Sequence, residues 1–328
     1  MRRYSISIAL CTYNGEKYLQ EQLASIGSQT RLPDELIISD DGSHDGTMEI
    51  IKEYQANSSF PVILNRNDKQ LGVVKNFENA ISLCRGDIIF LCDQDDYWYA
   101  EKLKTIEAIF IQTKCGMVFT NAEIVDESLN PLGYSLFTPY RCSPNYFGKK
   151  EQMELSYNPF KFLLKHNILT GATMAFRSSY KDIILPIPPI WDHDRWIGII
   201  ITAQSAITFL SKLLIKYRQH GKNEVGGPQR KVSGLLTKAR KRGQKYYQNE
   251  IIKIETLYNR LLQHSGEKEI FESLKYLEEY LKYLYSTSNL PKNLFYRLPY
   301  IIKSLLNGNY LRYSCGWQQV GLDMFFYQ

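Results

Sequence analysis

Short apolar runs alternate with amphipathic stretches through the first hundred residues. Four runs are apolar almost throughout and have the length of buried strands: 4–11, 35–39, 61–65 and 87–92. Three stretches between them repeat apolar side chains every three or four residues, as helices do: 16–28, 46–55 and 73–84. Strands and helices in this order predict βαβ units, and therefore an α/β fold whose mostly parallel sheet has helices on both faces.

The pattern continues less regularly downstream. We expect further strands at 117–121 and 168–176, and helices at 160–165 and 194–203. After a Gly-Gly-Pro sequence that ends at residue 228, the composition changes to helical segments that mix tyrosine with lysine. The chain is therefore predicted to form an α/β domain at 1–228 and an α-helical region at 229–328.

The net charge of +6 is concentrated in that last region. Residues 229–328 hold 16 Lys and Arg against 8 Asp and Glu, which leaves 24 against 26 in the nearly neutral remainder. Contents of 44% apolar and 23% charged residues are those of globular proteins and exclude a wholly disordered or collagen-like chain. The six cysteines form no CxxC pair, so we expect reduced core thiols, without disulfides or zinc.

Two arginines precede the first apolar run, as they do in a signal peptide. The run is too short for such a peptide and polar Thr12 and Asn14 follow at once, so we interpret it as the first strand of a cytoplasmic protein. The longest uncharged stretch, 196–211, falls short of the roughly 20 residues that a spanning helix needs. No transmembrane segment is predicted.

Carboxylates directly follow the fourth apolar run, at Asp93, Asp95 and Asp96. The carboxyl ends of parallel strands gather at the edge where such sheets bind ligands. Mg²⁺ and Mn²⁺ prefer oxygen ligands and commonly link one or two carboxylates to substrate phosphates. The same acids can instead cap the helix that follows, and these residues alone leave that alternative open.

Two other loops reach the same edge of the predicted sheet. Asp40 and Asp41 follow the second strand, and a carboxylate there can accept a hydrogen bond from a pyrimidine ring or a ribose hydroxyl. Thr12, Tyr13 and Asn14 follow the first strand, and the Tyr13 ring can stack on a base. Taken singly, both loops are equally typical of ordinary strand-to-helix turns.

A fourth cluster, Trp-Asp-His-Asp-Arg-Trp at 191–196, joins carboxylates, an imidazole and two indoles. A carboxylate there can act as a general base toward a hydroxyl group, and indoles can face a sugar ring. The alternative is a capped helix with both tryptophans in the core. Farther on, Arg218 offers hydrogen-bond donors suited to a diphosphate, and His220 offers an imidazole suited to a metal. A lone histidine is nevertheless more often an ordinary surface or core residue.

Taken together, these segments resemble family 2 of the glycosyltransferases, inverting enzymes of GT-A fold. The likeness is closest to bacterial rhamnosyltransferases that build capsular, O-antigen and cell-wall polysaccharides. It covers about residues 5–226 and rests on seven segments in family order: ISIALCTYNGEKYLQEQLASIGSQT, LIISDDGSHDGT, LGVVKNFENAI, FLCDQDDYWYAEKL, LTGATMAF, HDRW and YRQHGKNEVG. Each segment is short, but seven in order make an accidental match improbable.

The resemblance implies roles for individual residues. The positions that match the family's donor-binding residues are Thr12, Tyr13, Asn14, Glu16, Asp41 and Asp93, with Lys75 and Arg218 as candidates for phosphate contact. Asp95, the last residue of the DxD motif, and His220 match metal positions, for Mg²⁺ or Mn²⁺. Asp194 matches the catalytic base.

Candidate acceptor contacts follow from the same resemblance, at Trp191, His193 and Trp196. Many members have Glu-Asp where this chain has His193-Asp194, and Arg195 separates this pair from Trp196. This departure from the family pattern affects the assignment of the acceptor contacts and not the assignment of Asp194 as the base.

By this resemblance the protein is predicted to transfer L-rhamnose from dTDP-L-rhamnose to a hydroxyl of a growing, lipid-linked bacterial polysaccharide. A UDP-hexose donor is the alternative within the class. A nucleotide-sugar or nucleic-acid binding module is the alternative outside it, but paired carboxylates repel phosphate unless a cation intervenes, so no nucleic-acid partner is expected. A nucleotidyltransferase would need a glycine-rich basic phosphate loop, for which the first strand offers no convincing candidate.

The basic cluster at 230–245, with Tyr246, Tyr247 and the aromatic tail, suits a membrane surface. That interpretation predicts a peripheral protein on the inner face of the cytoplasmic membrane. A helical cap on the catalytic domain or on a sister subunit of a homodimer explains the same residues equally well.

Overall fold

The computed structural model describes residues 3–137, 152–154, 159–221, 244–266, 268–314 and 316–325. Contacts divide the chain into two compact units, one of residues 1–159 and 168–224 and one of residues 160–167 and 225–328. The domain boundary expected between residues 228 and 229 lies outside the described residues and stays a prediction. Segment 160–167, although early in the sequence, belongs by its contacts to the second unit.

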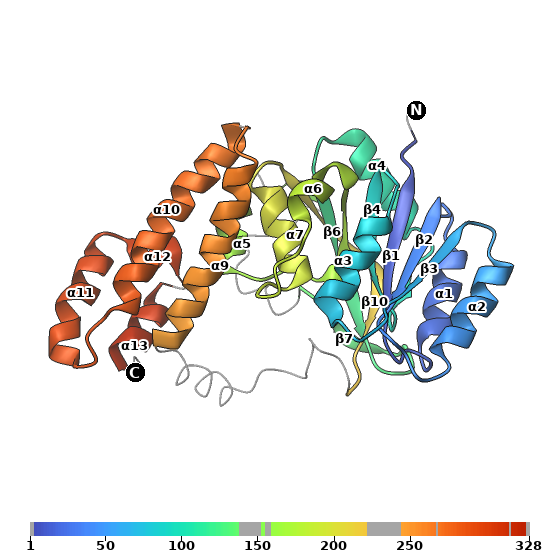
Figure 1. Ribbon diagram of the computed structural model, residues 1–328, viewed down its shortest axis with the longest axis horizontal. Coiled ribbons are helices and arrows are strands. Elements are labelled where there is room, and N and C mark those ends of the chain that lie inside the picture. Colours follow the sequence, from blue (N-terminus) through green and yellow to red (C-terminus); the bar gives the residue numbers. More distant parts are fainter. Residues whose placement is uncertain are drawn as a thin grey trace. The chain divides into compact units, whose positions relative to one another are not determined.

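The first four strands form a parallel sheet in the order β3-β2-β1-β4. They are β1 (Ile6–Thr12), β2 (Glu35–Asp40), β3 (Val62–Arg66) and β4 (Ile88–Asp93). Helices α1 (Leu19–Gly27) and α2 (Thr47–Asn57) lie on one face and α3 (Val73–Leu83) on the other (Figure 1). The predicted βαβ units are confirmed, with bounds that differ by up to three residues.

The alternation of side chains along β1 explains the two layers. Ile6, Ile8 and Leu10 join the core that also contains the apolar side of α1, whereas Ala9, between them, faces the side where α3 packs on β1 and β2. Both faces of the strand are buried, which is why its sequence is continuously apolar. The C-terminal ends of β1, β2 and β4 meet at one edge, since Thr12 pairs with Asp40 and Cys11 with Asp93.

The rest of the sheet is mixed. Strand β9 (Met174–Arg177) runs antiparallel between β4 and β6 (Met117–Val125), and β10 (Ile207–Arg218) runs parallel to β6. Short strands β5 (Tyr97–Trp98), β7 (Pro131–Ser135) and β8 (Gln152–Glu154) complete it. The remaining elements of this unit are α4 (Lys102–Gln112), η2 (Gly171–Thr173), η3 (Ser178–Tyr180), α6 (Lys181–Ile184) and α7 (His193–Thr202).

Two features of this half differ from the sequence prediction. The strand expected at 168–176 is a strand only from Met174, because Gly171–Thr173 forms the 3-10 turn η2. Strand β10 was not predicted, because its pairing with β6 shifts register around Leu213 and the alternation of apolar and polar residues is interrupted there.

The second unit is helical, as expected. Its helices are α5 (Pro159–Lys165), α9 (Gln244–Gln263), α10 (Lys268–Ser288), α11 (Leu294–Leu306), α12 (Asn309–Tyr313) and α13 (Trp317–Phe325). In the part of the chain that is described, no helix combines the length and the hydropathy needed to cross a membrane.

Tyrosine side chains form much of the core of the helical unit. Tyr280 and Tyr283 of α10 stack on Tyr313, with ring centroids 5.5 Å apart in both pairs. Tyr247 is buried and donates its hydroxyl hydrogen to Asp323 at 2.6 Å, so it does not belong to a membrane-facing surface as the sequence suggested. The basic residues at 230–243 lie outside the described residues.

Candidate functional site

The loop after β1 is tied to the loop after β2 by side chains of both. Asn14 has a positive φ of 48°, its backbone N–H donates to Ser43 Oγ at 2.9 Å, and its side-chain oxygen accepts from the His44 N–H at 2.9 Å. Glu16 accepts from the Gly46 N–H at 3.0 Å. Two of the predicted donor-binding residues, Asn14 and Glu16, therefore hold two loops in one arrangement.

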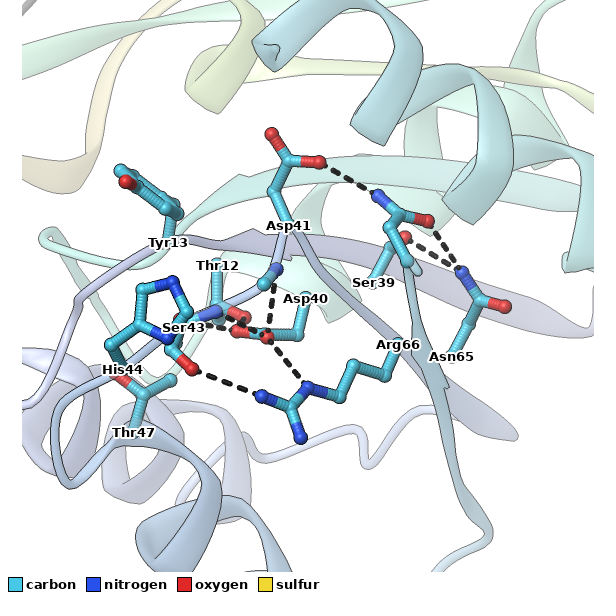
Figure 2. A network of polar contacts seen from close by, with 12 residues as sticks. Thr12, Tyr13, Ser39, Asp40, Asp41, Ser43, His44, Thr47, Asn65 and Arg66 are labelled. Atoms are coloured by element: carbon cyan, nitrogen blue, oxygen red, sulfur yellow. Dashed lines mark hydrogen bonds and ion pairs between the residues drawn. The ribbon is translucent and has the colours of Figure 1, made fainter. Parts of the chain in front are cut away.

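Asp40 is the centre of this arrangement, although the family resemblance implied no role for it. The carboxylate is fully buried, and it accepts hydrogen bonds from the hydroxyls of Thr12 (2.8 Å) and Ser43 (2.5 Å) (Figure 2). The N–H groups of Gly42 and Ser43 donate to its other oxygen. Thr12, predicted to bind the donor, is buried beneath Asp40 and supports the turn.

Asp41 is almost wholly buried and points away from the Asp40 network (Figure 2). Its carboxylate accepts hydrogen bonds from the Asn67 side chain at 2.9 Å and from the N–H groups of Leu71 and Gly72 at 2.8 Å. A carboxylate has about four lone-pair sites, so one acceptor position remains for a ligand. Tyr13 is 38% exposed, and its ring stands apart from the Asp40 contacts, as a stacking role requires.

Gln94, the middle residue of the acidic loop, connects that loop to the first one. Its side-chain oxygen accepts from the Tyr13 N–H at 2.9 Å, and its side-chain nitrogen donates to the Tyr13 carbonyl at 3.0 Å. A Cβ added to Gly15 would lie 2.3 Å from the Gln94 oxygen. The contact therefore requires glycine at position 15.

We expect Gly15→Ala to weaken nucleotide binding about tenfold, because it displaces a side chain that makes two hydrogen bonds of roughly 0.5–1.5 kcal/mol each. Calorimetric titration with a nucleoside diphosphate measures the effect. Gly266→Ala is the matched control, since a Cβ there meets nothing within 4 Å. An affinity for Gly15→Ala within twofold of wild type would show that the Gln94 clamp does not position the donor loop.

The acidic loop follows β4 directly, as predicted. Asp93 is the last residue of the strand, and Asp95 lies 2.8 Å from Nε2 of His220, measured from its Oδ2 atom. The imidazole stacks on Tyr18 of the first loop, with ring centroids 4.9 Å apart. The structure thus brings together Asp95 and His220, two residues 125 positions apart that were both predicted to bind a metal.

Arg218 holds this acidic loop through hydrogen bonds to its backbone and side chains. The side chain is nearly fully buried, and Nε donates to the Asp95 carbonyl at 2.7 Å. Its two terminal nitrogens bond to Glu21 and to the Glu127 carbonyl, and its backbone N–H donates to Asp96 at 3.1 Å. A guanidinium used in this way positions Asp95 and does not reach out for phosphate, so the predicted phosphate contact has no support here.

Lys75, the other candidate for phosphate contact, is paired as well. Its ammonium group lies 2.7 and 2.8 Å from the two carboxylate oxygens of Glu78, one turn along α3. Phosphate contact by Lys75 would require this pair to open, and it stays a prediction.

The donor set at the acidic loop fits a divalent cation that is completed by substrate. Within the described residues there is no group of three or more His, Cys, Asp or Glu side chains arranged to hold a metal. Asp95 supplies a carboxylate beside the His220 imidazole, and Mg²⁺ commonly takes one or two carboxylates together with substrate phosphates. Metal binding here stays a prediction.

Asp194 lies in the first turn of α7 and is half-buried. Burial raises its pKa to about 6, although the Arg195 N–H donates to its Oδ1 atom at 2.6 Å. A carboxylate with this pKa is ionised at neutral pH and more basic than an ordinary aspartate, as a general base should be.

Tyr217 lies close enough to both the acidic loop after β4 and Asp194 for their charges to affect it. Burial raises the pKa of its hydroxyl, and four nearby carboxylates raise it further, those of Asp96, Asp93, Asp95 and Asp194. The candidate base and the candidate metal loop are therefore within electrostatic reach of one phenol. Residue type does not single out Tyr217, because it is one tyrosine among 24.

His193 packs under Asp194. Its ring stacks on Phe77 with centroids 4.1 Å apart, and burial lowers its pKa to about 4, so the imidazole is neutral at pH 7. A Cβ on Gly171 would lie 2.7 Å from Nε2, an atom without a hydrogen-bond partner among the described residues. Gly171 thus allows η2 to approach α7 closely.

The two tryptophans near Asp194 belong to the core. Trp191 and Trp196 are 2% and 0% exposed, and the indole N–H of Trp196 donates to the Ile184 carbonyl at 2.8 Å. Neither indole offers a face to a sugar ring, so the predicted acceptor contacts are corrected to core packing, the alternative that the sequence left open.

The residues of the family 2 pattern thus occupy one edge of one sheet, and a family comparison agrees. The model of "Glycosyl transferase family 2" matches residues 7–183, more than half of the chain. The chain belongs to glycosyl transferase family 2. Its matched region contains β1 to β4, the acidic loop and η2, whereas Asp194 and His220 lie beyond its end.

Curated relatives of this family 2 chain come from bacteria. It is 38% identical over 104 residues to "Abequosyltransferase RfbV" of Salmonella typhimurium, a match to 31% of either chain. It is 29% identical over 268 residues to "dTDP-rhamnosyl transferase RfbG" of Shigella flexneri, a match to 75% of this chain and 83% of the relative. The chain spans less than a third of the first relatives that it matches.

Solved structures share the fold of this family 2 chain. "S. aureus TarS 1-349" superposes with a TM-score of 0.56 at 18% identity, over 90% of this chain and 78% of that one. The same protein in complex with UDP-GlcNAc gives a TM-score of 0.54 at 19% identity, over 76% of this chain and 66% of that one. The predicted GT-A fold, with a helical C-terminal region, is confirmed.

Proposed function

We propose that this protein is an inverting glycosyltransferase that moves a sugar from a nucleoside diphosphate to an acceptor hydroxyl in bacterial polysaccharide synthesis. The observation that carries the proposal is the geometry of the acidic loop: Asp95 lies 2.8 Å from His220, and Gln94 bonds to Tyr13 of the loop after β1. Asp194, whose pKa burial raises to about 6, offers the base. A base and a diphosphate site on one ligand edge are what single-displacement transfer requires.

Each group has a task in this reaction. Asp194 accepts the proton of the acceptor hydroxyl as the oxygen attacks the anomeric carbon from the face opposite the leaving diphosphate, which inverts that carbon. Asp95 and His220, with Asp93 nearby, would hold a divalent cation that neutralises charge on the leaving diphosphate. Arg218 keeps the Asp95 carbonyl in place, and the neutral His193 packs against Phe77 of α3 next to the base.

The donor proposed is dTDP-L-rhamnose. The name of the Shigella relative, which matches most of both chains, supports it, although that relative is only 29% identical. A UDP-hexose is the alternative, in line with the UDP-GlcNAc complex of the structurally similar TarS. The buried Asp41 fits either donor, because uracil and thymine present the same imide N–H.

A thermal-shift screen of nucleotide sugars with Mg²⁺ or Mn²⁺ tests the donor. We expect dTDP-rhamnose to raise Tm more than UDP-glucose or UDP-GlcNAc, since a ligand of the native state stabilises it by an amount that grows with the logarithm of ligand concentration over Kd. A larger shift with a UDP-hexose would reject the rhamnosyl donor and retain the transferase. Release of free sugar from the preferred donor would separate the enzyme from a binding module, which binds without cleavage.

A further inference from the structure

Helix α11 is apolar on the side that faces solvent. Residues at spacings of four, three and four form an exposed stripe along it: Phe295, Pro299, Ile302 and Leu306. Phe295 and Leu306 are 84% and 83% exposed. The opposite side of the same helix buries Arg297 and Ile301. A helix that is already buried on one side and is apolar on the other is normally covered on both.

Helices α12 and α13 pack against α11 (Figure 1). Exposed apolar side chains continue onto both of them. Leu311 of α12, Trp317 of α13 and Phe325 at the end of α13 are each at least two-thirds exposed. A hollow of about 260 Å³ joins the end of the stripe to them, lined by Leu305, Leu306, Tyr310, Leu311, Gly316 and Trp317. We call the stripe with Leu311, Trp317 and Phe325 the α11–α13 surface.

Charges within the segment that forms this surface are mostly positive, although Arg297 is buried and Arg312 pairs with Glu279 of α10 at 3.4 Å. Residues 289–325 contain four basic residues and a single acid, Asp323. Asp323 is buried and accepts hydrogen bonds from Tyr247, Tyr310 and Gln319, so it does not offset the positive charge outside. Lys292 and Lys303, beside the stripe, are exposed.

We propose that the α11–α13 surface docks on the headgroup region of an anionic lipid bilayer. An apolar surface with Phe and Trp, flanked by Lys292 and Lys303 and without an exposed acid of its own segment, has the chemistry of an interfacial helix. The charge complementarity favours anionic lipid over a second copy of this chain, because two copies would bring the same positive charge together. The proposal rests on the proposed glycosyltransferase function, since it would hold the enzyme at the membrane surface, where a lipid-linked acceptor lies.

Flotation of the full chain with vesicles tests the proposal. We expect binding to phosphatidylcholine vesicles that contain 30 mol% phosphatidylglycerol, and at least about tenfold less binding for the triple variant Phe295→Gln, Ile302→Gln and Leu306→Gln. Lys292→Glu with Lys303→Glu should reduce binding to the anionic vesicles and leave the weak binding to pure phosphatidylcholine unchanged.

The matched control replaces three apolar residues that are exposed elsewhere in the helical unit, Ile252→Gln, Leu262→Gln and Phe271→Gln. It should float like wild type. Equal loss in both triple variants, or no flotation of wild type, would overturn the membrane proposal. The proposal would also be overturned if light scattering showed a dimer of the wild-type chain that the stripe variant dissociates. Donor hydrolysis without vesicles should be the same in all variants, so its failure would concern the proposed function and not the surface.

Discussion

Replacing Asp194 with asparagine should reduce sugar transfer at least about 10³-fold, within the range lost with a general base. Asparagine has the same shape and its side-chain oxygen can still accept from the Arg195 N–H, so the start of α7 should stay intact. Affinity for the nucleoside diphosphate should remain within about twofold of wild type, because the loops that hold it do not include α7. Single-turnover transfer and calorimetric titration measure the two quantities.

The pH dependence follows from the same carboxylate. Burial raises the pKa of Asp194 to about 6, and only the ionised form can accept a proton, so kcat/KM should fall about tenfold per pH unit below pH 6. Above pH 7 this group is fully ionised and the rate should no longer depend on it. Asp194→Asn should abolish this acid limb along with the activity.

Asp192→Asn is the matched control for this prediction. Asp192 precedes Asp194 by two residues, carries the same charge, is exposed, and makes no capping hydrogen bond with its side chain. Its replacement should leave the rate near that of wild type. Turnover near wild type in Asp194→Asn itself, or loss of activity in both variants, would remove Asp194 from the mechanism.

Patterns that repeat along the chain predicted the fold well. The buried strands β1, β2 and β4 are apolar on both faces, so short continuous apolar runs identify them without knowledge of their neighbours. Strand β10 could not be found in this way. Its 12 residues contain a register shift, and only pairing with the distant β6 shows that it is one strand.

The candidate site could be predicted as far as the family resemblance reaches, because it assigns both Asp95 and His220 to metal positions. Asp95 and His220 carry groups that suit a metal, and the structure places them 2.8 Å apart. Asp40 and Arg218 have equally reactive groups, but whether such a group points at a ligand or holds a loop depends on burial and partners. That information lies in contacts between distant segments, such as Arg218 with Glu21, which no spacing along the chain reveals.

Replacing Asp95 with alanine should reduce transfer by at least about 10²–10³-fold, because a bound cation is worth several kcal/mol of charge stabilisation. The variant also removes the carboxylate partner of His220. Unlike Asp194→Asn, this variant should lose the effect of metal on nucleotide binding. Addition of Mn²⁺ should raise nucleotide affinity in wild type and in Asp194→Asn but not in Asp95→Ala.

Asp182→Ala, an exposed acid on α6, should behave as wild type and controls for loss of a carboxylate. Asp95→Asn refines the test, since an amide can keep a hydrogen bond to His220 while it lacks the charge that attracts a cation. If the hydrogen bond alone were needed, Asp95→Asn would be active. We expect it to be as inactive as alanine, and transfer near the wild-type rate in either variant would reject a metal at Asp95.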